Sequence, residues 1–279
     1  MAHSSHAPTA KLSDSDRLTL IAISALAYIV AVGLHEHLGH TVACFMLGSH
    51  PVEVGAFYVN CDYTGLSDIR IRLVALAGPV ISLLIGLGSF FLLQRRPPHT
   101  SAAYYFVWLL GSIGFMSATG YLLFSGILGI GDFGTGRDGV FYLATPEWLW
   151  RIILTIVGLG SYILSIHIAV RNIDPHISGT GRARIQSARR LALTSYLTGA
   201  TISIAIGLLN PQGVIIVVTS AAASSLGATS GLLWMMQRLD RNRQVPAPGL
   251  VIQRNWRWIA LGGIVTVVYA LVLGPTLHP

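Results

Sequence analysis

Seven runs of mostly apolar residues divide this 279-residue chain. Each run has about the 20 residues that a helix needs to cross the hydrocarbon core of a bilayer. Hydrophobic residues make up 53% of the chain and charged residues only 10%, which excludes an ordinary soluble domain. The sequence therefore predicts an all-α polytopic membrane protein with about seven transmembrane helices, over residues 18–47, 73–93, 102–128, 148–170, 191–210, 213–236 and 256–274.

The start of the chain and its net charge limit how it is processed and what it binds. Residues 1–17 form a polar tail, and the apolar run after them is far longer than the core of a signal peptide. We therefore expect the first helix to be retained in the bilayer. The net charge of +7 is spread along the chain rather than gathered into one basic face, so we expect no nucleic-acid partner.

The basic residues fall mainly on one side of a seven-span arrangement. That side receives Lys11, Arg17, Arg95, Arg96, Arg171, Arg182, Arg184, Arg189, Arg190, Arg238, Arg241, Arg243, Arg254 and Arg257, whereas the other side receives only Arg70, Arg72, Arg137 and Arg151. The positive-inside rule then places the N-terminus in the cytoplasm and the C-terminus outside. We expect a plasma membrane or a bacterial inner membrane.

Four ionisable side chains interrupt the first apolar run: His35, Glu36, His37 and His40. Ionisable groups inside a membrane segment usually face the protein interior and carry function, because hydrocarbon offers them no partner. Imidazole and carboxylate groups on about two helical turns are typical of a divalent-metal site, and the familiar zinc motif is His-Glu-x-x-His. A metal site is therefore expected. The alternative is a packing cluster satisfied by backbone and water.

The spacing in this chain is one residue longer than that zinc motif. At roughly 100° per residue, His35 and His40 lie about 140° apart around a regular helix, but a π-bulge would bring them together. We predict that His35 and His40 are ligands and that Glu36 is the general base. Two other registers keep a regular helix: Glu36 and His40 as ligands, or His37 and His40 with Glu36 adjacent.

Residues 51–68 have no helical period and are rich in β-branched and aromatic residues and glycine. They predict a short β-hairpin or a re-entrant loop. Such backbone persists near membrane depth only where protein or a water-filled cavity covers it, so we expect the segment to lie over the metal site. A free strand edge there would hold an extended peptide by main-chain hydrogen bonds. An ordinary interfacial loop is the alternative.

A single carboxylate follows the third apolar run, in the glycine-rich segment 125–134. Catalytic zinc takes three protein ligands and leaves a position for water, so Asp132 is the predicted third ligand and one zinc ion the predicted cofactor. Asp138 is the second candidate, although Arg137 beside it favours a solvated loop.

The remaining residues offer less chemistry. Cys44 and Cys61 are the only cysteines, and we expect neither a disulfide framework nor a thiolate metal site. His167 is expected to be a packing residue. We divide the chain into a metal-binding core, residues 18–145, and four accessory helices in residues 146–279, whose basic loops set the topology and can contact anionic lipid.

Three features in this order resemble the site-2 protease family of intramembrane zinc peptidases. They are the motif of residues 35–40, then Ala77-Gly78-Pro79 in a run of small residues that lets helices pack closely, and then Gly131-Asp132. The resemblance covers about residues 20–140. It implies a membrane-associated β-hairpin, zinc held by His35, His40 and Asp132, and Glu36 as the base.

The chain departs from that family in four respects. The first motif has an extra residue, Ser82 stands where the family often has Asn, and Gly131-Asp132-Phe133 replaces Leu-Asp-Gly. The family also usually opens its site toward the cytosol, whereas the arginine distribution puts residues 51–68 outside.

These features predict a zinc-dependent endopeptidase that acts in the lipid bilayer on a membrane protein substrate. A catalytically inactive relative that binds a membrane partner is one rival, which the irregular motif favours. A metal transporter is another, but a transporter should have polar residues in several helices, and the last four runs have almost none.

Overall fold

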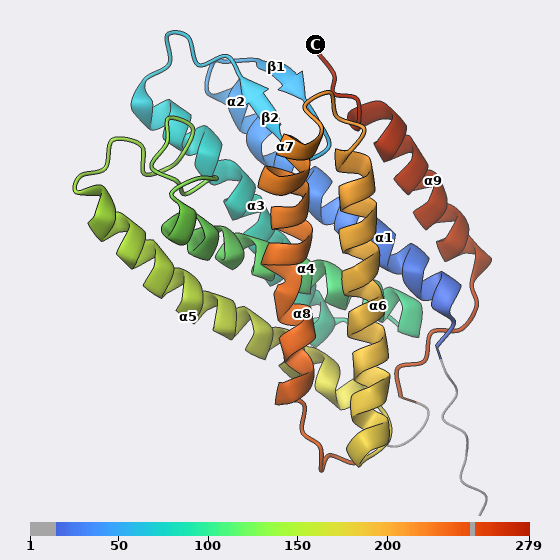
Figure 1. Cartoon of the computed structure of the whole chain (residues 1–279). Coiled ribbons are helices and arrows are strands. Elements are labelled where there is room, and N and C mark those ends of the chain that lie inside the picture. Colours follow the sequence, from blue (N-terminus) through green and yellow to red (C-terminus); the bar gives the residue numbers. More distant parts are fainter. Residues whose placement is uncertain (1–14, 246–248) are drawn as a thin grey trace, which may run out of the picture.

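The computed structural model describes residues 15–245 and 249–279, most of which are helical. Among these described residues, six helices are long and apolar enough to cross a membrane: Arg17–Met46, Asp68–Arg95, Ser101–Leu128, Glu147–His176, Val214–Arg238 and Trp256–Leu273. Together they make the chain a polytopic, all-α membrane protein (Figure 1).

The first of these helices consists of α1 (Arg17–Gly33), η1 (Leu34–Thr41) and α2 (Val42–Met46), and the strands β1 (Pro51–Val54) and β2 (Val59–Cys61) follow it. The next long helices are α3 (Asp68–Arg95), α4 (Ser101–Leu128), α5 (Glu147–Ile173) with η2 (Asp174–His176), and α6 (Gly181–Gly207). The last part contains α7 (Val214–Ile216), η3 (Val217–Ala221), η4 (Ala223–Gly227), η5 (Ala228–Ser230), α8 (Gly231–Trp234), η6 (Met235–Arg238) and α9 (Trp256–Leu273).

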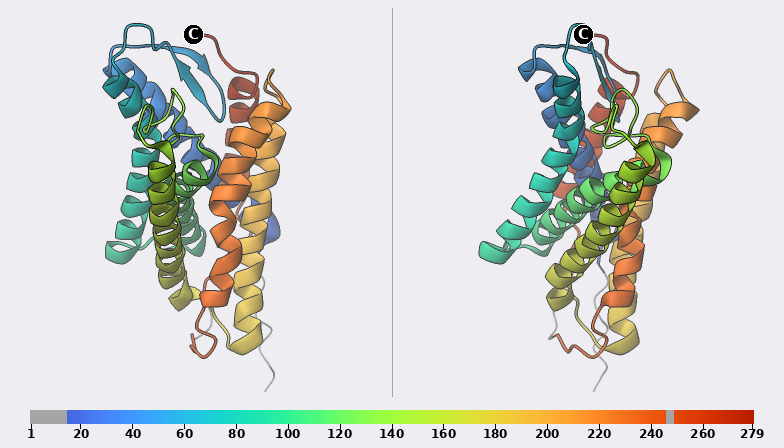
Figure 2. Two further views of the ribbon diagram at one scale, coloured as in Figure 1. Left: turned by 60° about the vertical axis from the view of Figure 1, so that its left-hand side comes forward. Right: turned by 90° about the vertical axis from the view of Figure 1, so that its left-hand side faces the viewer.

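The run at 191–210 lies in α6, which is not among the six most apolar helices. Arginines occupy its first half and hydroxyl residues its second. The hydroxyl of Ser195 is buried and bonds inside the bundle, at 2.6 Å from Ser24 Oγ and 2.7 Å from Tyr105 OH. Because neighbouring helices satisfy such groups, α6 is less apolar than the helices around it. Figures 1 and 2 show it running beside the segment of residues 214–238.

Helix α1 lies at the centre of the bundle, in contact with α4, α6 and α9. Asp16 caps its first turn by accepting a hydrogen bond from the Thr19 backbone N–H at 2.9 Å, and this bond holds the pKa of Asp16 below its usual value. Most of the following residues of α1 are buried. The helix therefore carries its polar C-terminal extension, η1, into the protein interior rather than toward lipid.

The strands β1 and β2 form a two-stranded antiparallel sheet, in which Val54 lies opposite Val59. The other edge of β1 is occupied by the end of the chain, because Val54 and Leu277 exchange two backbone hydrogen bonds of 2.9 Å. The Tyr269 hydroxyl of α9 also donates to the Ala56 carbonyl at 2.6 Å. The sheet is thus fixed at the end of the bundle where the C-terminus lies (Figure 1).

A disulfide between Cys44 and Cys61 joins α2 to β2, with a Cα–Cα distance of 6.2 Å. This pairing corrects the expectation that the two cysteines form no disulfide framework. Cys44 lies near the end of its helix, and the chain turns back two residues after α2, at Gly48, where φ is +86°. The turn brings β2 against the face of α2 that carries Cys44, and this contact was not evident from two isolated cysteines.

Candidate metal centre

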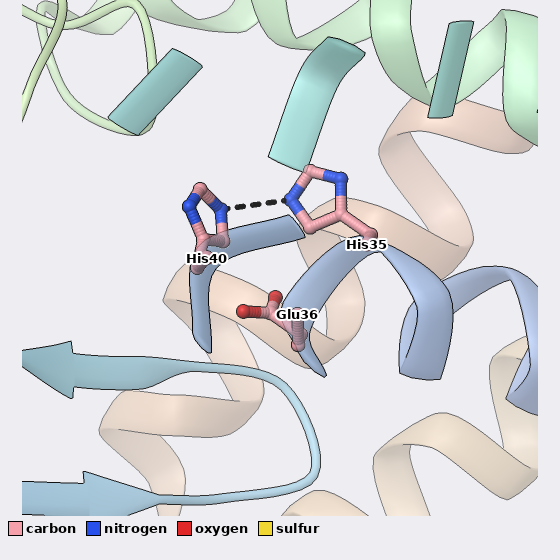
Figure 3. Close-up of side chains that lie close together, drawn as sticks. All are labelled: His35, Glu36 and His40. Atoms are coloured by element: carbon pink, nitrogen blue, oxygen red, sulfur yellow. Dashed lines mark hydrogen bonds between the residues drawn. The ribbon is translucent and has the colours of Figure 1, made fainter. Parts of the chain in front are cut away.

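The segment that carries the ionisable motif is a π-helix, η1, between two regular α-helical segments. Its wider turn absorbs one extra residue, so residues five apart lie on the same face. His35 and His40 consequently point at each other, with 3.3 Å between their Nε2 atoms (Figure 3). This arrangement is the one that the first predicted register requires.

Asp132 reaches the two histidines from the loop after α4. Gly129 and Gly131 both have positive φ, +77° and +84°, values that glycine adopts without a steric penalty. They turn the chain back so that Asp132 Oδ2 lies 3.2 Å from His35 Nε2 and Oδ1 lies 3.5 Å from His40 Nε2. The three predicted ligands are therefore brought together from two distant segments.

The spacing of these donor atoms fits a zinc ion. Tetrahedral zinc with bonds of about 2.0–2.1 Å separates its ligand atoms by about 3.3 Å. The two Nε2 atoms are 3.3 Å apart, and each has a different oxygen of Asp132 nearby, Oδ2 at 3.2 Å from His35 and Oδ1 at 3.5 Å from His40. In addition, Asp132 Oδ2 is buried without a hydrogen-bond partner among the described residues, so it is available to a cation.

The other ring nitrogen of each histidine has a partner on α3. His40 Nδ1 lies 2.8 Å from the Val74 carbonyl, which can only accept, so Nδ1 carries a proton and, in the neutral ring, Nε2 keeps its lone pair. His35 Nδ1 lies 2.9 Å from Ser82 Oγ. Metal-binding histidines usually donate their second N–H in this way, which orients the ring. Both imidazoles thus present Nε2 to the centre.

Close approach of two glycines allows α3 to pack against η1. A Cβ on Gly39 would lie 2.7 Å from Gly78 Cα, and a Cβ on Gly78 would lie 2.3 Å from His40 Nε2 and 2.7 Å from His35 Nε2. The glycine of Ala77-Gly78-Pro79 therefore makes room for both imidazoles, a role more specific than the close helix packing expected from the sequence.

Glu36 is buried beside the two histidines, and its carboxylate lies within 4.8 Å of a ring nitrogen of each. A cavity of about 10 Å³ borders His35, Glu36, Ser82 and Tyr121, which is room for about one water molecule. The carboxylate is thus close enough to act on such a water, and also close enough to be a ligand in the second predicted register.

The other candidates lie apart from this cluster. His37 faces Tyr269, with 6.3 Å between ring centroids. Within the described part of the chain, His35, Glu36 and His40 have ligand atoms within 4.8 Å of one another, and Asp132 joins them through its contacts with both histidines. Asp138 is exposed in its loop. The geometry therefore favours the register in which His35 and His40 converge.

Two residues that contact the candidate ligands were given no such role from the sequence. Ser82 bonds His35, and Tyr121 stacks on the His35 ring at 5.1 Å with an interplanar angle of 12°. A signal for Ser82 does exist: Val74, Gly78 and Ser82 are spaced four residues apart and so share one face of α3. The contact of Tyr121 depends on how α4 packs, and no sequence pattern indicates it.

Comparisons of this chain with protein-family models, with curated proteins and with solved structures found no match.

Proposed function

We propose that this chain is an intramembrane zinc metallopeptidase that hydrolyses peptide bonds in membrane-embedded or juxtamembrane segments of membrane proteins. The observation that carries the proposal is the convergence of His35 Nε2, His40 Nε2 and the Asp132 carboxylate beside the buried Glu36. Two imidazoles and one carboxylate suit zinc better than magnesium or calcium, which prefer oxygen ligands. The same residues carry the resemblance to site-2 proteases.

In this proposal His35, His40 and Asp132 hold the metal. A bound zinc ion supplies a Lewis acid and lowers the pKa of water at the site toward neutrality. Glu36 accepts the proton of the attacking water and passes it to the leaving amine. The hydrogen bonds to Val74 and Ser82 keep the two rings in the orientation that this chemistry needs.

The proposed substrate lies in an extended conformation along β2. The backbone N–H and C=O of Val54 are both hydrogen-bonded to Leu277. Val59 lies directly opposite Val54 in the antiparallel pair, so its own N–H and C=O point away from β1. In the described part of the chain no further strand pairs with β2. This edge is available for β-augmentation by a peptide, and the sheet lies on the Glu36 side of the site (Figure 3).

Metal analysis of the purified protein tests the site. We expect about one zinc ion in the wild type, and its loss in His40→Ala and Asp132→Ala, because each change removes one of three ligands. His167→Ala is the matched control, since this histidine is exposed on α5, outside the cluster. Retention of stoichiometric zinc by both ligand variants refutes the site.

The variant Glu36→Gln tests whether Glu36 acts as the general base or as a metal ligand. The amide is nearly isosteric but cannot accept a proton, so we expect the variant to keep zinc and to lose about 10²- to 10⁴-fold in cleavage rate. Loss of zinc would instead make Glu36 a ligand. Wild-type protein that binds zinc but cleaves no co-occurring membrane substrate would favour the inactive, partner-binding relative.

We further propose seven crossings, with the N-terminus in the cytoplasm and the C-terminus outside. Helix α6 supports the seventh crossing, because it is 27 residues long and runs beside the segment of residues 214–238 (Figure 2). We expect reporter fusions to give cytoplasmic signals at residues 95–101, 171–190 and 237–257 and an external signal at 51–68. A cytoplasmic signal at 51–68 contradicts this topology.

A further inference from the structure

The Cys44–Cys61 disulfide connects the two elements that border the metal centre. Cys44 lies four residues, about one helical turn, after His40, and Cys61 lies in the proposed substrate-binding strand, β2. Both cysteines are buried, and they pack against Val74, whose carbonyl accepts the hydrogen bond of His40 Nδ1. The bond therefore clamps β2 at a fixed position relative to the ligands and to Glu36.

A disulfide also indicates a compartment. Disulfides persist on the oxidising side of a membrane, whereas cytosolic thiols are kept reduced. The arginine distribution independently puts residues 51–68 outside the cytoplasm. Since Cys44 and His40 lie one turn apart on the same helix, both observations put the metal centre at the external end of the bundle.

We infer that the substrates are membrane proteins cleaved at the extracytoplasmic end of a membrane-spanning segment, and that the Cys44–Cys61 clamp makes cleavage depend on the oxidising compartment. This inference rests on the proposed peptidase function, and it reverses the cytosolic opening that the family resemblance implies. Closing the clamp removes two electrons and two protons from the two thiols. A thiol–disulfide oxidoreductase takes them up as its own disulfide is reduced to two thiols.

The first test counts thiols in the full-length protein in its native membrane. The chain has two cysteines, so the number of maleimide adducts shows directly whether the two thiols are free or joined in the disulfide. We expect no adduct when intact cells are quenched with acid and alkylated in denaturant, and two adducts when reduction precedes alkylation. Two adducts without reduction overturn the inference.

The second test determines the side of the membrane. Thr64 and Asn242 are both exposed, Thr64 after β2 and Asn242 at the other end of the bundle. In a Cys44→Ser/Cys61→Ser background we expect a membrane-impermeant maleimide to label Thr64→Cys in intact cells, and Asn242→Cys only after permeabilisation. The reverse pattern overturns the inference.

A third measurement links the clamp to the site. Reduction of the wild-type protein, verified by adduct count, should lower the rate of substrate cleavage by at least about tenfold, because small displacements of a bound substrate cost up to about 10²-fold. The zinc content should not change, since neither cysteine is a ligand. Unchanged cleavage after verified reduction overturns the clamp. Wild-type protein without zinc refutes the proposed peptidase and leaves the thiol result standing.

Discussion

At the scale of single residues, the space around the two histidines depends on one missing methyl group. Gly78 is the point where α3 passes over the centre, and a methyl group there would lie well inside the contact distance of both Nε2 atoms. The obstructing atoms belong to imidazoles whose Nδ1 atoms are already bonded to α3 itself. Neither ring can move away from a new Cβ without breaking one of those bonds.

Gly78→Ala should therefore abolish zinc binding. Gly88 offers a matched control on the same helix, because a Cβ there meets nothing within 4 Å, and in that position Ala has the higher helix propensity. We expect Gly88→Ala to keep zinc and to be at least as stable as the wild type. Elemental analysis of both variants checks this, and full zinc occupancy in Gly78→Ala would contradict the packing argument.

Residue chemistry made the candidate ligands predictable as candidates, but it did not predict the neighbours that orient their side chains. His35, Glu36 and His40 stand out because an apolar run should not contain ionisable groups, and Asp132 because it is the first acid in the glycine-rich segment. The carbonyl of Val74 could not be identified in this way, because every residue has a carbonyl. Its role follows only from the packing of α3 on η1.

At the scale of elements, η1 accommodates one extra residue without changing which faces of α1 and α2 are buried. A π-helical turn holds one residue more than an α-helical turn, so α1 and α2 keep their own faces. Helical geometry predicted this feature, because His35 and His40 could meet only if one residue were absorbed. The partner of β1 was not predictable, since Val54 and Leu277 are far apart in the sequence and their contact uses only backbone atoms.

Deletion of Leu38 should convert η1 into a regular α-helix and retain the site. Leu38 is 49% exposed, so its loss removes little packing, and the remaining His-Glu-His-Gly-His has the ordinary spacing of a zinc motif. We expect the deletion variant to keep both zinc and the Cys44–Cys61 disulfide, measured by elemental analysis and thiol counting.

Deletion of Ile29, buried in the regular part of α1, is the control for that variant. The regular helix around Ile29 has no extra residue that could compensate for the deletion, so every following residue rotates by about 100° relative to the start of α1. Zinc should be lost. The opposite result would contradict this account. If the folded Leu38 deletion variant loses zinc and the folded Ile29 deletion variant keeps it, then η1 does not accommodate the extra residue.

At the scale of the whole molecule, the two ends of the bundle are held in different ways. The end with the candidate metal centre is tied by the β1–β2 sheet, the disulfide and the chain's last residues. At the opposite end the Arg184 guanidinium of α6 is fully buried, and it donates to the backbone carbonyls of Asp174 and Ile177. Arg184 also forms an ion pair with the Asp174 carboxylate. The apolar runs predicted most helices, but not this ion pair, because Arg184 looked like one of many topology-setting charges.

Asp174 lies between two arginines at that end, paired with the buried Arg184 and, at 2.8 Å, with Arg243. Asp174→Asn keeps the shape of the side chain but leaves the Arg184 charge buried without a counter-charge. Breaking a buried pair from one side costs about 3–5 kcal/mol, and we expect a loss near the lower bound because the carbonyls still accept from the guanidinium. Unfolding by denaturant in detergent measures the change in free energy.

Arg243→Gln serves as the control, because Arg243 is 42% exposed and Arg184 still neutralises Asp174 in this variant, so we expect a loss of at most about 1 kcal/mol. Zinc bound per folded molecule should be unchanged in both variants, since the metal centre lies at the other end of the bundle. Equal losses in the two variants would mean that Asp174 acts through Arg243 at the surface. A loss of zinc in the folded Asp174→Asn protein would mean that the two ends are coupled through α5 and α4, which are packed against each other along their length.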